Sequence, residues 1–165
     1  MIVHRFLGDT RGSAAVEMAL VMPILMALMF GGLEAGHYFW TEHKALEGVR
    51  AGARYAARLP MSTVCPSSGG IPAQTITDIK NVTRTGKLDA NAAPVVPGWT
   101  AAKVSVNFHC GTFLSSGIYT TLGGQGATVT VASSNLTYPS LMGALGIIRS
   151  TAKLSAASNA PVIGI

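Results

Sequence analysis

A single carboxylate, Glu17, interrupts an otherwise apolar run of the sequence. The run reads SAAVEMALVMPILMALMFGGL from Ser13 to Leu33 and contains no other charged residue. An isolated carboxylate within a bilayer is costly, so such a residue usually has a partner and a function. The alternative is a carboxylate that lies at the membrane interface and reaches the lipid headgroups.

Cys65 and Cys110 are the two cysteines of the chain, and both follow the apolar run. If that side of the membrane is outside the cytoplasm, a disulfide between them is the natural interpretation. The alternative is a pair of unrelated free thiols. A bridged Cys110 cannot act as a nucleophile, although His109 is its neighbour.

No other group of residues has the spacing of a catalytic or ligand site. His37 and His43 are six residues apart, which places them on different faces of a helix and argues against a metal site. Asp78 and Asp89 lack nearby His or Glu partners, and no nucleotide, zinc or nucleophile motif is present. Basic and aromatic residues do not alternate as on a nucleic-acid platform. We therefore expect no enzyme activity, no cofactor, no metal, no nucleic acid and no small-molecule substrate.

Length and charge indicate a membrane protein with one small outer domain. Only 12% of the 165 residues are charged, against about a quarter in soluble domains. The apolar run is long enough to span a bilayer as a helix. Arg5 and Arg11 precede it, whereas Glu34 and Glu42 follow it. The positive-inside rule therefore predicts a cytoplasmic N-terminus and a domain outside the cytoplasm.

Two features of the span bear on how it packs. Pro23 removes one helical hydrogen bond and should kink or locally loosen the helix. Gly31, Gly32 and Gly36 form a small-residue face, and the last two have the spacing that lets helices approach closely. Glycine is also simply frequent in membrane helices, and both interpretations have equal weight.

The N-terminal segment resembles type IV pilin precursors. A basic leader ends at Gly12, four residues separate Gly12 from Glu17, and a long apolar run follows. The resemblance implies that a prepilin peptidase cleaves between Gly12 and Ser13. Cleavage would create an ammonium group on Ser13, which in an assembled bundle can pair with Glu17 of a neighbouring subunit. Such a pair would set the axial register between subunits.

A narrower resemblance covers roughly the first third of the chain. Its ordered pieces are Arg11-Gly12, Ala15-Val16-Glu17, Pro23, Gly31 to Glu34, Arg50-Ala51-Gly52-Ala53-Arg54 and Ala56-Ala57. Together they resemble the TadE-like family, minor pseudopilins of Flp/Tad pilus systems. Met18 stands where family members often carry an aromatic residue. The resemblance implies a bacterial inner-membrane protein. Its implied partners are pilin or pseudopilin subunits, the pilus assembly platform, the prepilin peptidase and membrane lipid.

The helix should continue beyond the bilayer to Arg58, because Leu59-Pro60 supplies the first stop after Glu34. An apolar face at helical spacing should pack on the outer domain. That face comprises Leu46, Val49, Ala53 and Ala56.

Arg50, Arg54 and Arg58 follow one another at intervals of four and form a basic stripe on this helix. The stripe could bind an acidic partner surface or anionic headgroups, but more often such a stripe is a solvated face. Glu47, three residues before Arg50, can pair with it along the helix.

The remaining sequence predicts a small mixed domain. A helix is expected over residues 73–85, closed by Gly86. Alternating patterns predict strands over residues 104–110, 127–131 and 152–156, and residues 138–148 indicate a loop or short helix covering the core. We expect an α+β, pilin-like fold in which a long N-terminal transmembrane helix packs on a small antiparallel sheet. The expected divisions are a leader (1–12), a transmembrane and membrane-proximal helix (13–58) and an outer domain (59–165).

Two functions fit these features. The first is a minor pilin or pseudopilin that joins or primes a Flp/Tad-type pilus, whether in the membrane or incorporated into the extracellular fibre, and so supports adhesion. The alternative is a membrane-anchored envelope binding protein that does not polymerise.

Overall fold

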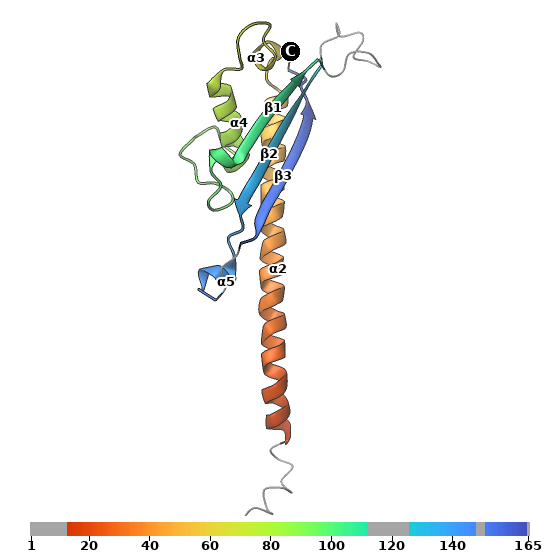
Figure 1. Cartoon of the computed structure of the whole chain (residues 1–165), viewed down its shortest axis with the longest axis vertical. Helices are drawn as coiled ribbons and strands as arrows, with labels where there is room; N and C mark the ends of the chain where they lie inside the picture. Colours follow the sequence, from red (N-terminus) through yellow and green to blue (C-terminus); the bar gives the residue numbers. More distant parts are fainter. Residues whose placement is uncertain (1–12, 112–125, 148–150, 165) are drawn as a thin grey trace, which may run out of the picture. The chain divides into compact units, whose positions relative to one another are not determined.

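A computed structural model describes residues 13–111, 126–147 and 151–164 (Figure 1). The expected leader, the site after Gly12 and most of the loop expected over residues 115–126 lie outside this part. The chain divides into two compact units, residues 1–37 and residues 38–165. The described elements are α2 (Ser13–Ala57), α3 (Met61–Val64), α4 (Ala73–Thr85), η2 (Ala101–Lys103), β1 (Val104–Cys110), β2 (Ala127–Thr137), α5 (Leu141–Ala144) and β3 (Lys153–Pro161).

The described part of the first unit is the N-terminal stretch of α2. This helix is long and apolar enough to cross a membrane. It is helical from Ser13 and continues through Pro23 without a break in its assignment. The large apolar side chains from Val16 to Leu33 are all exposed in the isolated chain. A helix that is apolar on every side requires a covering of lipid or of other helices.

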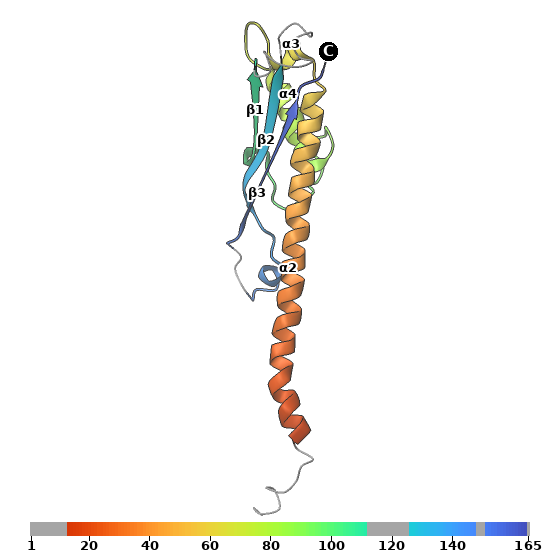
Figure 2. The same cartoon turned by 90° about the vertical axis from the view of Figure 1, so that its right-hand side faces the viewer.

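The second unit contains a three-stranded antiparallel sheet in the order β1-β2-β3 (Figure 2). β1 has the bounds that its alternating sequence predicts. β2 is longer than predicted, because an irregularity between Ser133 and Leu136 shifts the register and returns Leu136 to the buried face. Asn135 has a φ of 56°, a conformation that Asn tolerates better than most residues. β3 is also longer than predicted and consists largely of small residues.

The C-terminal stretch of α2 supplies one side of the domain core. Val49 and Ala56 are fully buried, as the predicted apolar face requires, and Leu46 is partly buried against the same cluster. The sheet contributes Val129 and Val131 to the same cluster. The predicted α+β class, a long apolar N-terminal helix with a small antiparallel sheet, is therefore confirmed.

α4 crosses α2 at two glycines. A Cβ on Gly48 would lie 2.5 Å from the Thr83 carbonyl oxygen and 2.7 Å from the Trp99 ring, and a Cβ on Gly52 would collide with the Thr83 hydroxyl. The Thr83 hydroxyl donates to the Ile79 carbonyl at 2.7 Å, so it is satisfied although buried. The helices meet this closely only because both positions of α2 lack side chains.

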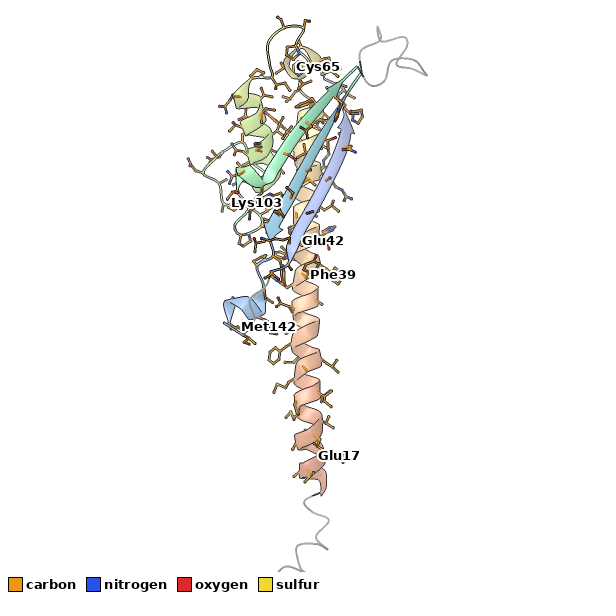
Figure 3. All side chains as sticks on the ribbon, viewed as in Figure 1. Glu17, Phe39, Glu42, Cys65, Lys103 and Met142 are labelled. Atoms are coloured by element: carbon orange, nitrogen blue, oxygen red, sulfur yellow. A yellow bond between two sulfur atoms is a disulfide. The ribbon has the colours of Figure 1, made fainter. Side chains whose placement is uncertain are left out.

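The end of the domain near α3 is held by covalent and backbone bonds. The predicted disulfide between Cys65 and Cys110 is present, with its Cα atoms 5.9 Å apart, and Figure 3 labels Cys65 near α3. The Ile163 N–H donates to the Ala57 carbonyl at 2.8 Å, and the Val162 N–H donates to the first residue of β2 at 2.8 Å. These bonds fasten the last residues of the chain to the end of α2.

The connection after β2 does not cover the core as expected. Tyr138 is buried and meets Tyr38 edge to face, with ring centroids 5.1 Å apart. Beyond Tyr138 the four-residue α5 buries none of its side chains. The expectation that this segment covers the core is wrong beyond Tyr138, because the two tyrosines already close that end of the domain.

Candidate assembly surface of the N-terminal helix

Glu17 lies on the second turn of α2, four residues after the first helical residue Ser13. Its side chain is exposed, near the N-terminal end of the helix (Figure 3). Within residues 13–111, 126–147 and 151–164, no side chain forms a salt bridge with it. Positions four apart share one face of a helix. The structure therefore places the helix start and the carboxylate on one face, and leaves the carboxylate open to another molecule.

The cleavage position after Gly12 lies outside the described residues, so processing stays a prediction. The kink at Pro23, which lies within described α2, also stays a prediction. Pro23 has no backbone N–H, so the Ala19 carbonyl receives no helical hydrogen bond from position 23.

Glycines within the span pack against no other described residue of this chain. A Cβ on Gly31, Gly32 or Gly36 would meet no atom within 4 Å. Their small size is therefore not required by any contact with the described residues. It leaves a face on which a second helix could approach closely.

The basic stripe is exposed throughout, at Arg50, Arg54 and Arg58. The expected Glu47–Arg50 pair does not form. Glu47 instead lies 3.4 Å from Lys44 and 3.4 Å from His43. Helical side chains tilt toward the helix N-terminus, so Glu47 reaches back along the helix rather than forward. The guanidinium groups are thus available to solvent or to a partner.

Gly48 and Gly52 are structural residues that the sequence analysis did not single out. The signal was present, since the two glycines have the same four-residue spacing as Gly32 and Gly36. The missing information was Thr83, which the sequence places on a different helix and which packs into the gap.

Neither of two hollows on the surface of the domain assembles a catalytic pair. A hollow of about 160 Å³ at the helix crossing contains Lys44 and Glu47, which already pair with one another in solvent. A hollow of about 260 Å³ beside the disulfide is lined by Pro66, Phe108 and neighbouring glycines. The described residues also contain no group of three metal-ligating side chains.

Comparison with known proteins identifies the N-terminal segment of the chain. Residues 12–54 match the family model described as TadE-like protein. The prediction of a TadE-like segment is confirmed over this range, which includes Glu17, Pro23 and two residues of the basic stripe. No curated protein and no solved structure matches the chain. The disulfide and the whole sheet lie beyond the matched segment.

Proposed function

We propose that this protein is a minor pilin or pseudopilin of a Flp/Tad-type pilus. The match to the TadE-like family indicates a protein associated with a Tad pilus. The observation that carries the finer proposal is that the matched segment contains the one long stretch of α2 that no other part of the described chain covers. A subunit built to assemble through its N-terminal helix would have such a stretch.

The proposed location is the bacterial inner membrane. α2 crosses the bilayer once, with the N-terminus in the cytoplasm and the sheet domain outside it. The charges flanking the span support this direction, and the disulfide is suited to an oxidising compartment. The partners are other pilin or pseudopilin subunits, the assembly platform, a prepilin peptidase and membrane lipid.

Assembly would use the charge on Glu17. Peptidase cleavage after Gly12 breaks that peptide bond with water and leaves an ammonium group on Ser13. In a bundle of subunits this cation pairs with Glu17 of a neighbouring chain, where the low dielectric strengthens the attraction. Because each charge is costly to bury alone, subunits out of register are disfavoured. The pair thereby sets the axial position of one subunit against the next.

The outer domain would be incorporated together with the helix as a folded domain. Its core and its disulfide are formed within one chain. No catalytic role is proposed for it. Its contribution is to the composition or priming of the pilus and, through the pilus, to adhesion.

The alternative is an anchored envelope protein that binds a target and never polymerises. An exposed aromatic groove on the outer domain would favour it. Among the described residues the large exposed aromatic side chains are Phe30, Phe39 and Trp40, all on α2. We therefore favour assembly through the helix.

Replacement of Glu17 tests the proposal in the native host. We expect Glu17→Ala to insert into the membrane normally and to be lost from sheared pili or from the isolated assembly complex. Glu42→Gln removes a charge from the same helix beyond the span and is the matched control, which should assemble normally. Normal incorporation of Glu17→Ala would remove Glu17 from the mechanism. Absence of the native protein itself from sheared pili and from the assembly complex would favour the binding-protein alternative.

A further inference from the structure

Residues 139–147, which follow β2, expose apolar side chains although hydrogen bonds hold their backbone. The Ser140 hydroxyl accepts from the Gly143 N–H at 2.9 Å and caps α5. Leu141, Leu145 and Ile147 are nevertheless 43%, 71% and 64% exposed. Clustered exposed apolar residues on a small domain mark a surface that contacts something else.

This segment lies at one defined end of the domain. The Ile163 N–H bonds to Ala57, and Val162 bonds to Ala127, so β2 starts beside the C-terminal end of α2. β2 ends at Tyr138, which packs on Tyr38. Between Tyr38 and Ala57 a helix rises about 28 Å. Residues 139–147 therefore lie about 28 Å from the α3 end of the domain. Figure 1 shows α5 at the end of the sheet opposite α3.

The same end of the domain is where the membrane surface is expected. Tyr38 follows the apolar stretch of α2 by a few residues, and Phe39 and Trp40 next to it are 67% and 55% exposed. Aromatic residues in this position occupy the interface between lipid and water. Because Tyr138 contacts Tyr38, the chain leaves the domain core at the level of that interface.

We propose that residues 139–147 form a second membrane contact, in which Leu141, Leu145 and Ile147 enter the boundary between headgroups and acyl chains. The inference rests on the membrane anchoring of the proposed function and adds a lipid-binding surface on the outer domain. Lipid is the occupant because the segment lies at the level of Tyr38, where the apolar stretch of α2 ends. Entry into lipid would bury no charged side chain of this segment, because the sequence between Lys103 and Arg149 contains no Asp, Glu, Lys or Arg.

A second contact has a mechanical consequence. A domain held by one helix alone can rotate about that helix, whereas two contacts fix which face is presented to the membrane. The basic stripe and the edge strands β1 and β3 would then face defined directions relative to the membrane. Removal of the subunit from the bilayer would have to release this contact as well as the helix.

Spin labels on the full chain in lipid vesicles test the proposal. Both native cysteines are joined in the disulfide, so an introduced cysteine is the free thiol under non-reducing conditions. Leu145→Cys places the label in the proposed contact. Ile163→Cys places it at an equally exposed apolar residue at the far end of the domain, and Leu28→Cys places it in the span. Collision rates with oxygen and with a water-soluble nickel chelate report the depth of each label.

The proposal predicts a label at position 145 about 5–10 Å inside the headgroup boundary, a label at 163 in water and a label at 28 in the hydrocarbon. A label at 145 in water, with 28 in the hydrocarbon, overturns this inference and leaves the anchor intact. Immobilisation of label 145 that grows with protein concentration identifies a second copy as the occupant and also overturns it. A label at 28 in water overturns the anchor itself.

Discussion

Gly36 and Gly52 lie in the same helix, yet an added methyl group would meet opposite surroundings at the two positions. At Gly36 it would meet no atom within 4 Å, whereas at Gly52 it would collide with Thr83. The C-terminal stretch of α2 thus packs against residues of the same chain, such as Thr83 of α4. The N-terminal stretch has exposed large apolar side chains that no described residue covers.

Charged residues show the same difference. Glu47 lies in the C-terminal stretch, in solvent, and pairs with Lys44 and His43. Glu17 lies in an apolar stretch and forms no salt bridge with the described residues. A solvated pair contributes little to stability, whereas a carboxylate in a low-dielectric setting must find a cation or become neutral. Among the described residues, Glu47 therefore has ion-pair partners and Glu17 has none, although both lie on exposed positions of one helix.

Removal of the disulfide should have the largest effect on the domain and none on the span. The bridge closes 45 residues, and a loop of this size corresponds to about 4 kcal/mol in the chain-entropy account. We expect the double variant Cys65→Ala with Cys110→Ala to lose that free energy of unfolding. Denaturant titration of the full chain in detergent, followed by circular dichroism of the domain, measures it. Loss of membrane insertion in the same variant would contradict the separation of the two units.

Leucine truncation should distinguish the covered and the uncovered parts. Leu136 is 1% exposed, and Leu28 is 69% exposed. Leu136→Ala should lower the free energy of unfolding of the domain by about 3 kcal/mol, because it removes buried contacts and leaves a cavity. Leu28→Ala should leave the same denaturation midpoint unchanged. Equal shifts for the two variants would mean that the span contributes to the domain core.

Addition of a single methyl group should destabilise the domain at Gly52 but not at Gly36. Gly52→Ala should destabilise the domain by about 2 kcal/mol, because α4 must move away from α2. Gly36→Ala adds the same group where space is open and should not destabilise the domain. Denaturation of both variants under the same conditions gives the comparison. A neutral Gly52→Ala would show that the helix crossing can relax without cost.

The smallest effect is expected for the exposed charges of the C-terminal stretch. Glu47→Gln removes both solvent-exposed pairs and should change the free energy of unfolding by less than about 1 kcal/mol. The change should shrink further when salt is added. A larger, salt-independent loss would show that Glu47 has a structural role that its two exposed pairs do not explain.

Local patterns predicted much of the fold. Ile79 and Gly86 follow helical spacing and helix-end rules, so α4 was predicted with its observed bounds and its αL cap. Val104 to Cys110 alternate in sequence and form β1 as expected. These elements depend on residues close together in the chain, which is the information that a single sequence contains.

Features that depend on distant residues were not predicted. The irregularity after Ser133 breaks the alternation, so the second half of β2 had no recognisable period. The close approach at Gly52 requires Thr83 from another helix. Tyr138 closes the core with Tyr38, which is why the apolar residues after it stay outside. For the candidate site, the sequence predicted the position of Glu17, whereas only the structure shows that no described residue forms a salt bridge with it.

Intact mass spectrometry of the protein purified from its native membrane is the decisive test of assembly through the N-terminal helix. We expect a chain that lacks residues Met1 to Gly12, begins at Ser13 and gains two hydrogen atoms when its disulfide is reduced. An uncut chain would contradict assembly through a new N-terminus and would indicate a permanently anchored envelope protein. A cut after the apolar run would show that the run is a signal peptide rather than an anchor.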